Sequence, residues 1–358
     1  MDTLKKLALG ILSPLFIILL FTTAFDIGFV RTATHPGTVK KLVTESGIYD
    51  SVIPSLLQQT KSIQTDVGTI SASDPAIQKA ATAAITPQYI KQNTETAIDS
   101  VYKWLDGKTA QPDFKIDLSG AKTSFADNVA TSVSQRLSSL PACTLAQSVA
   151  LTAGGQFDAV NTPCLPRGVT PDAAAAQVKN SITGGKDFLD KTTISAASIK
   201  NSGDNQSVFQ SGKLAQAPKQ YQRAKKTPFI LSILTILTGV GIVFLSSTWL
   251  VGLRHIGINL VVIGLIMLLF SYGLNRAVST KVVPTIKVDN AILQTDIRNL
   301  ATDLTQQIDK NYWYFGGLYT VLGAGSIAAA EIFRRRANPA PAGTVIAVAE
   351  ESKAKKDR

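Results

Sequence analysis

The stretch PFILSILTILTGVGIVFLSSTWLV, residues 228–251, is a long apolar run without a charged side chain. Three similar runs occur, LALGILSPLFIILLFTTAFDIGFV at residues 7–30, IGINLVVIGLIMLLFSYGL at residues 256–274 and WYFGGLYTVLGAGSIAAA at residues 313–330. A helix of about 20 apolar residues crosses a hydrocarbon core of about 30 Å. The sequence therefore predicts a mainly α integral membrane protein with four transmembrane helices.

The chain as a whole is apolar, because 45% of its residues are hydrophobic and only 17% are charged. The excess of hydrophobic residues lies in the four runs. We predict a cytoplasmic N-terminus (1–6), transmembrane helices (7–30, 228–251, 256–274 and 313–330), a large helical extracytoplasmic domain (31–227), an extracytoplasmic helical arm (275–312) and a cytoplasmic tail (331–358). The large domain has the length of an ordinary domain with its own core.

The first run follows Lys5 and Lys6 as in a secretory signal, but its apolar stretch is longer than that of a typical signal peptide. No good cleavage motif follows it, so we interpret the run as an uncleaved signal anchor. The alternative is cleavage near Ala24 or Ala33, which would leave three spans.

Basic residues near the ends of the spans give an equivocal orientation. On the side of the large domain lie Arg31, Lys40, Lys41, Lys219, Arg223, Lys225, Lys226, Arg276, Lys281, Lys287 and Lys310. On the side of the termini lie Lys5, Lys6, Arg254, Arg334, Arg335 and Arg336. The count alone favours a cytoplasmic large domain, but long domains translocate largely regardless of charge. The anchor, the C-terminal Arg triplet and the cysteines favour an extracytoplasmic one.

The large domain shows helical rather than strand periodicity. Apolar residues at three-to-four-residue spacing predict a first helix interrupted near Gly47 and Pro54, a second from Pro87 to Gly107, a third from Leu118 to Leu140 and a fourth from Pro171 to about Leu189, with Thr170 as its N-cap. No long alternating run predicts a substantial sheet. The polar segment 195–212 is predicted to be weakly ordered. Between the last two spans, a stripe from Ile286 to Ile308 predicts a helical arm that continues toward the fourth span and packs on the large domain.

The chain has two cysteines, Cys143 in LPAC and Cys164 in TPCLP. A disulfide between them would close a loop of about 20 residues and contribute about 3 kcal/mol. Such a bond indicates an oxidising compartment. The alternative is two unrelated buried thiols. A zinc site is disfavoured because His35 and His255 are the only histidines.

The net charge of +11 raises the question of nucleic acid, but no recognition motif accompanies it and the basic residues flank the spans. We therefore predict the lipid bilayer as a partner and no nucleic acid. The stretch KQYQRAKK contains Lys219, Arg223, Lys225 and Lys226. It is interpreted as a site for anionic lipid headgroups or an acidic envelope polymer, or as a plain stop at the interface.

Two roles are possible for Trp104 and two for Asp26. The indole of Trp104 lies at the edge of an apolar stripe, where it either stacks on a sugar or peptide or packs against the core. Asp26 is an ionisable residue near the end of the first run, and it either handles a proton or ion or extends its carboxylate to the interface.

Small and polar residues within the spans predict helix packing. The pairs Thr235 and Gly239, Ala324 and Ala328, and Ser326 and Ala330 are four residues apart, a spacing that lets helices approach closely. Asn259 is predicted to hydrogen-bond to a neighbouring helix. Arg254 and His255 are placed in a tight turn between the second and third spans.

No motif of an enzyme is present, neither G-x-S-x-G, nor a phosphate-binding GxxxxGK[ST], nor H-E-x-x-H. We predict no catalytic residue, no cofactor and no metal. Residues 84–118, AITPQYIKQNTETAIDSVYKWLDGKTAQPDFKIDL, followed by LPAC at 140–143, resemble uncharacterised bacterial membrane proteins with an extracytoplasmic helical domain. That resemblance implies no known activity.

The layout of one span, a large domain and three further spans is similar to that of permease subunits of the FtsX and MacB type. The short turn between the second and third spans and the long segment before the fourth depart from that layout, which puts coupling to an ATPase in doubt. We expect a non-enzymatic protein of the cell envelope whose extracytoplasmic helical domain binds a protein partner or an envelope component. The alternative is a sensor or accessory subunit of a membrane transporter.

Overall fold

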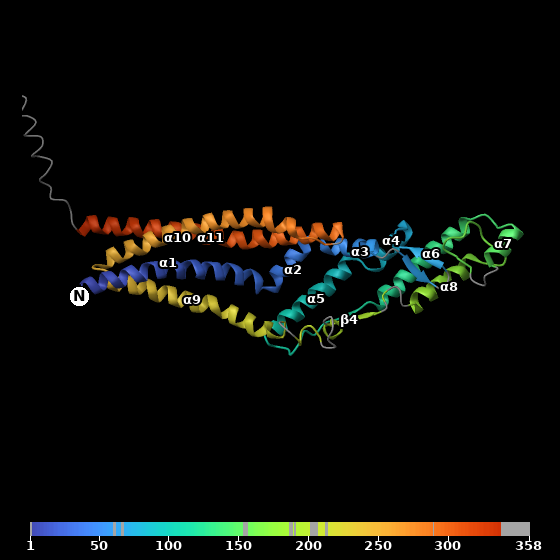
Figure 1. Ribbon diagram of the computed structural model, residues 1–358, viewed down its shortest axis with the longest axis horizontal. Helices are drawn as coiled ribbons and strands as arrows, with labels where there is room; N and C mark the ends of the chain where they lie inside the picture. Colours follow the sequence, from blue (N-terminus) through green and yellow to red (C-terminus); the bar gives the residue numbers. More distant parts are fainter. Residues whose placement is uncertain are drawn as a thin grey trace, which may run out of the picture. The chain divides into compact units, whose positions relative to one another are not determined.

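A computed structural model describes residues 2–59, 62–65, 68–152, 157–185, 189, 191–200, 207–211, 214–288 and 290–337 of the chain. These residues form eleven α-helices and two small antiparallel sheets (Figure 1). The chain divides into two units. Unit 1 is built from Met1–Arg31, Lys226–Ala277 and Gln306–Arg358, and unit 2 from Thr32–Lys225 and Val278–Thr305.

The four long helices are α1 (Asp2–Ala33), α9 (Ala217–Leu245), α10 (Trp249–Ala277) and α11 (Ala291–Ala337). Each contains a stretch long and apolar enough to cross a membrane. All four extend beyond the predicted spans at one end or both, because helical hydrogen bonding continues into the polar sequence that flanks an apolar run. α11 is a single helix of 47 residues.

The turn between α9 and α10 lies at residues 246–248, so its predicted position at Arg254 and His255 is wrong. Both of these residues are exposed positions within α10. The chain turns at 246–248 because the side chains of Ser246, Ser247 and Thr248 can hydrogen-bond locally and so compete with the hydrogen bonds of the helix backbone. The Ser246 hydroxyl donates to the carbonyl of Ile242 at 2.7 Å, and the Thr248 hydroxyl accepts from the Val251 N–H at 3.4 Å.

Buried side chains of all four long helices form the core of unit 1, namely Phe16, Leu20, Ala24, Ile242, Ile263, Met267 and Tyr312. Pairs of polar side chains in this unit hydrogen-bond across helices. The hydroxyls of Thr23 and Thr235 lie 3.0 Å apart, and Asn259 Nδ2 donates to the Ser13 hydroxyl at 3.0 Å. The predicted hydrogen bond from Asn259 to another helix is therefore confirmed.

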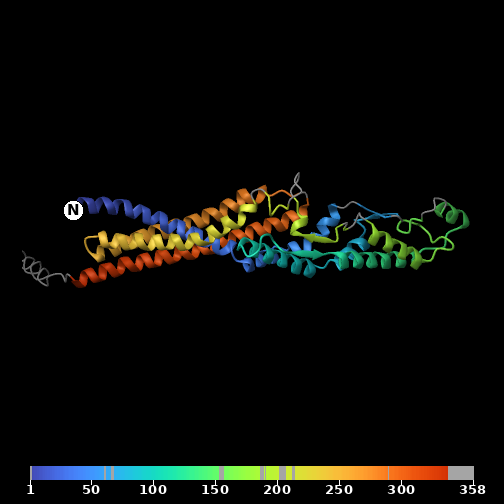
Figure 2. The same cartoon turned by 90° about the horizontal axis from the view of Figure 1, so that it is seen from below.

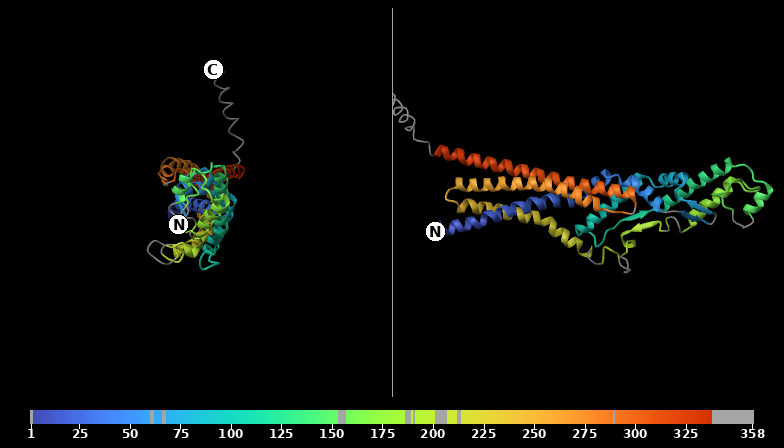
Figure 3. Two further views of the ribbon diagram at one scale, coloured as in Figure 1. Left: turned by 90° about the vertical axis from the view of Figure 1, so that its right-hand side faces the viewer. Right: turned by 45° about the horizontal axis from the view of Figure 1, so that its top comes forward.

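Glycines bring α10 and α11 close together in unit 1, where the two helices run side by side (Figure 3). A Cβ on Gly257 would stand 2.9 Å from the carbonyl oxygen of Gly323, and a Cβ on Gly264 would stand 2.8 Å from that of Gly316. Within α10 and within α11 the two glycines are seven residues apart, which is two helical turns. Both contacts therefore lie on one face of each helix.

Unit 2 contains the remaining secondary structure. Its helices are α2 (Pro36–Glu45), α3 (Ile48–Gln59), α4 (Pro75–Ala84), α5 (Pro87–Leu105), α6 (Ser119–Ser139), α7 (Leu145–Thr152) and α8 (Pro171–Gly184). The strands β1 (Ser62–Thr65) and β2 (Gly68–Ser71) pair antiparallel, as do β3 (Lys115–Asp117) and β4 (Thr193–Ser195). Short turns of 3-10 and π-helix cover Ala196–Ser198, Leu214–Gln216, Val278–Val282 and Val283–Thr285.

Local signals explain the helix ends. The hydroxyls of Thr86 and Thr170 accept from backbone N–H groups in the first turns of α5 and α8, at 3.2 and 3.3 Å. Both helices begin with proline, which suits the first turn because it has no N–H to leave unpaired. Gly47 separates α2 from α3 with a φ of +81°, where a side chain would be strained. Pro54, predicted as a second break, lies inside α3.

The core of unit 2 is built mainly from α3, α4, α6 and α8 together with Ile70 of β2. Helices α6 and α8 run side by side (Figures 1 and 2). The predicted stripe of α6 is buried, with Phe125, Val129 and Leu137 each 0% exposed. α8 ends at Gly184, before the predicted Leu189, and the Lys122 ammonium donates to the carbonyl of the adjacent Gly185 at 2.7 Å. Of the segment predicted to be weakly ordered, residues 201–206 and 212 lie outside the described residues, while Ser195 and Ala196–Ser198 belong to β4 and a 3-10 turn.

Candidate functional site

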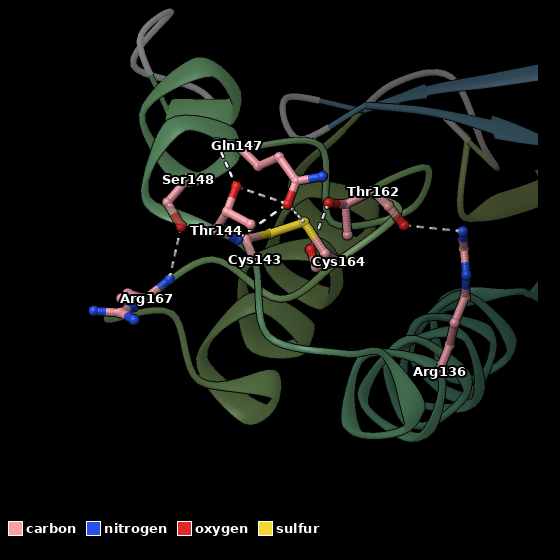
Figure 4. The surroundings of a disulfide bond; sticks show 8 residues. All are labelled: Arg136, Cys143, Thr144, Gln147, Ser148, Thr162, Cys164 and Arg167. Carbon is pink, nitrogen blue, oxygen red and sulfur yellow. Dashed lines mark hydrogen bonds between the residues drawn. A yellow bond between two sulfur atoms is a disulfide. The ribbon is translucent and has the colours of Figure 1, made fainter.

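One end of unit 2 is held by a disulfide between Cys143 and Cys164, whose Cα atoms are 5.0 Å apart (Figure 4). Both cysteines are buried, at 3% and 5% exposure. Two backbone hydrogen bonds lie beside the disulfide, from the Cys143 N–H to Leu165 and from the Leu165 N–H to Pro141, each 2.9 Å long. The two loop segments that carry the cysteines are therefore joined by both covalent and backbone hydrogen bonds.

Polar side chains support these segments (Figure 4). The buried Thr162 hydroxyl donates to the carbonyl of Cys164 at 2.8 Å, and the Arg136 guanidinium donates to the carbonyl of Thr162 at 3.4 Å. On the other segment, Gln147 Oε1 accepts from the backbone N–H of Thr144 at 3.0 Å. These contacts fix the start of α7 and the chain around Cys164.

The helix that follows Cys143, α7, exposes its apolar side chains. Leu145 and Val149 are 67% and 65% exposed, and they lie four residues apart on one face of the helix. Ala146 and Ala150 are exposed beside them. We call these four residues the α7 surface. No charged residue occurs between Leu145 and Thr152, so the surface is apolar and uncharged.

A polar groove of about 410 Å³ runs between α6 and α8, lined by Asp127, Ala130, Thr131, Ser134, Gln135, Asp172, Ala175 and Ala176. Its two carboxylates are partnered. The Lys179 ammonium lies 2.5 Å from Asp127, and the Ser134 hydroxyl donates to Asp172 at 2.8 Å. The groove therefore does not offer two unpartnered carboxylates as an acid and a base. Within the part of the chain that the structure describes, no three His, Cys, Asp or Glu residues are grouped as metal ligands.

The four basic residues singled out in the sequence, Lys219, Arg223, Lys225 and Lys226, are all exposed on α9. The first three belong to unit 2, and Lys226 belongs to unit 1. Lys225 also has an internal partner, because its ammonium lies 2.8 Å from the Asp106 carboxylate and 5.7 Å from the centre of the Tyr221 ring. The hydrogen bond from Lys225 holds the pKa of Asp106 below its ordinary value.

Two tyrosines near this ion pair are positioned by backbone carbonyls of unit 2. The Tyr221 hydroxyl donates to Thr34 at 3.1 Å, and the Tyr102 hydroxyl donates to Ala33 at 2.7 Å. Burial, followed by the neighbouring Tyr221, raises the pKa of Tyr102 to about 12. Both hydroxyls are therefore structural donors, and their hydrogen bonds hold the two tyrosines near the ion pair between Lys225 and Asp106.

Trp104 lies inside unit 2, where its indole is 4% exposed. Its ring meets the Phe209 ring edge-on, with centroids 5.4 Å apart. Trp104 therefore packs inside unit 2, and its ring offers no open face to a sugar or a peptide. The stripe position alone could not distinguish the two interpretations, because Phe209 is about a hundred residues away in the sequence.

Two residues with structural roles, Asn290 and Asp309, were not predicted from the sequence. Asn290 is the N-cap of α11, where its Oδ1 accepts from the N–H groups of Ile292 and Leu293 at 3.0 and 3.1 Å. An Asn just before a helical stripe is a recognised N-cap signal. Asp309 accepts a hydrogen bond from the buried Ser271 hydroxyl. This pair joins two helices of unit 1, and no sequence spacing could have paired them.

No family model, curated protein or solved structure matches this chain. The resemblance of residues 84–118 to bacterial membrane proteins therefore stays a prediction.

Proposed function

We propose that this chain is a non-enzymatic integral membrane protein of a cell envelope whose unit 2 binds a partner protein through the α7 surface. The observation that carries the proposal is the exposure of Leu145 and Val149, at 67% and 65%, on a helix adjoining a disulfide. Exposed apolar groups that adjoin one another are characteristic of interaction sites. A helix whose start is already fixed loses less conformational entropy when a partner binds.

Unit 2 is placed on the extracytoplasmic side in this proposal. The disulfide between Cys143 and Cys164 supports that side, because such bonds persist in oxidising compartments. A Ser139→Cys variant tests it, since Ser139 is exposed at the end of α6. A membrane-impermeant maleimide should label this thiol in intact cells. Labelling only after the membrane is opened would place unit 2 in the cytoplasm and overturn this part of the proposal.

Photocrosslinking in living cells tests the α7 surface. A photoreactive amino acid at Ala146 should form a discrete adduct with a partner protein, and the matched control is the same amino acid at Ser139, which is exposed outside the α7 surface. Adding Leu145→Ser and Val149→Ser should abolish the adduct at Ala146. Equal adducts at both positions, or an adduct that survives the double substitution, would contradict the proposal.

A second candidate function is that of a sensor or accessory subunit of a transporter. It is favoured by the continuity of α11, which runs without a break past residues 305 and 306, where the two units divide. A helix that is common to both units gives a ligand bound to unit 2 a direct covalent route to unit 1. Crosslinking in native membranes followed by purification of the tagged full-length chain tests this function. Stoichiometric recovery of an ATPase or kinase would favour it, and recovery of extracytoplasmic proteins alone would favour the first.

A further inference from the structure

Unit 1 contains a pocket of about 510 Å³ that borders the carboxylate-bearing residue Asp26. The other residues that line it are Phe21, Thr22, Phe25, Thr227, Leu231 and Phe270. They come from α1, α9 and α10, and all belong to unit 1. The pocket thus combines one carboxylate and two hydroxyls with a mainly apolar wall.

Three phenylalanines that line this pocket contact one another. The Phe21 and Phe270 rings meet edge-on with centroids 5.6 Å apart, and the Phe25 ring lies 6.0 Å from Phe270 and 6.2 Å from Phe21. The face of an aromatic ring attracts a cation within about 6 Å of its centroid. A carboxylate beside several such rings is an environment suited to an ammonium group.

One oxygen of the Asp26 carboxylate, Oδ2, is buried and has no hydrogen-bond partner among the described residues. Leaving a carboxylate oxygen unpaired away from water is costly, and ionisable residues in spans normally face a partner or a water-filled cavity. The pocket of about 510 Å³ that Asp26 borders has room for a cation beside its carboxylate.

Three lining residues place the pocket near the ends of the predicted spans. Asp26 and Phe270 each lie four residues before the end of an apolar run, and Thr227 immediately precedes another. All three ends are on the same side of the membrane in the predicted topology. Headgroups begin at this depth, whereas acyl chains fill the deeper region. A ligand that reaches the pocket from the bilayer would therefore present its headgroup to Asp26.

We infer that this pocket binds the protonated amine of an amine-headed membrane lipid, with Asp26 as the counter-ion. The ammonium group contacts the carboxylate and the rings of Phe21, Phe25 and Phe270, while the upper part of an acyl chain lies along Leu231. An anionic headgroup without an amine would be repelled by the carboxylate. This inference goes beyond the partner-binding role of unit 2 and does not depend on it.

The test uses the full-length protein reconstituted in vesicles of equal parts dioleoyl phosphatidylethanolamine and dioleoyl phosphatidylglycerol. After extraction in a mild detergent, native mass spectrometry measures which lipid stays bound. The wild type should retain the phosphatidylethanolamine in preference. Asp26→Asn should reduce that retention about tenfold, as expected for loss of one charged hydrogen bond.

Asp309→Asn is the matched control, because it removes the same charge from unit 1 but keeps an oxygen that can accept from Ser271. It should retain the lipid like the wild type. A second variant, Leu231→Trp, fills the pocket and should also reduce retention while the circular dichroism of the helices is unchanged. Equal retention of the two lipids by the wild type, or undiminished retention by Asp26→Asn or by Leu231→Trp, would overturn the inference.

Discussion

Asn290 and Ser55 hydrogen-bond to each other although 235 residues separate them in the sequence. The Ser55 hydroxyl donates to Asn290 Oδ1 at 3.1 Å, and Asn290 Nδ2 donates back to the Ser55 carbonyl at 3.2 Å. Both side chains are buried, at 4% and 2% exposure. One amide thus caps α11 and fixes the start of that helix to α3 within unit 2.

Replacing Asn290 by alanine should loosen the first turns of α11. The variant loses an N-cap and leaves the buried Ser55 hydroxyl without its acceptor, which together lower local stability by about 2 kcal/mol. Hydrogen exchange of the full-length protein, followed in peptides from residues 292–301, should become about 30-fold faster. Asn290→Asp keeps the acceptor for the N–H groups of Ile292 and Leu293 and should show a smaller change. Unchanged exchange in the alanine variant would show that the cap is dispensable.

Within unit 2, periodicity and end signals located several helices well. The Phe125, Val129 and Leu137 stripe of α6 is buried as predicted, because an amphipathic helix has one face that must leave water. The segment before the fourth span could be predicted as a helix from its own stripe. Its attachment to α3 through Asn290 could not, since hydrogen bonds between distant segments have no local sequence signature.

Within unit 1, the sequence identified the apolar runs and part of the way in which the helices meet, because Thr235 and Gly239 of α9 are buried against Thr23 and Phe16 of α1. The four-residue spacing predicted close helix packing at Ala324 and Ala328. In the structure, α10 and α11 approach closely at Gly257 with Gly323 and at Gly264 with Gly316. A spacing of seven also keeps residues on one face, but matching glycines on two helices requires knowledge of their register. Asp26 was identified as ionisable, and only the three-dimensional structure placed the phenylalanines and the pocket around it.

Gly323→Ala should separate α10 from α11. The new Cβ would stand 2.6 Å from the carbonyl oxygen of Gly257 and 2.7 Å from the backbone nitrogen of Val261, and backbone atoms have little room to move. Overpacking of this kind typically costs about 1–3 kcal/mol, so thermal unfolding of the purified protein should occur at a lower temperature. Gly325→Ala is the control, because a Cβ there has no neighbour within 4 Å. Equal melting temperatures for the two variants would refute the close contact.

The ion pair between Asp106 and Lys225 should make a small contribution that depends on pH. Because its partner lowers the pKa of Asp106 in the folded state, the stabilisation is complete above the unfolded pKa of about 3.9 and is lost as the pH falls through the lower folded value. The side chains are 25% and 49% exposed, so the contribution is about 0.5 kcal/mol. The melting temperatures of wild type and Asp106→Asn should differ at about pH 6 and converge as the pH falls through the folded pKa of Asp106. A difference that grows on acidification would contradict this account.

Comparison of a Cys143→Ser and Cys164→Ser double substitution, which removes the disulfide, with the Leu145→Ser and Val149→Ser variant should separate stability from partner binding. The sequence separation of 21 residues gives an expected loss of about 3 kcal/mol in the chain-entropy model. α7 should then exchange its amide hydrogens faster, and photocrosslinking from Ala146 should weaken because the α7 surface is no longer held in place. The Leu145→Ser and Val149→Ser variant differs, since it should lose crosslinking while its melting temperature stays near that of the wild type, both side chains being exposed. If the cysteine variant melts lower yet crosslinks as well as the wild type, the disulfide stabilises the fold without preparing the α7 surface for its partner.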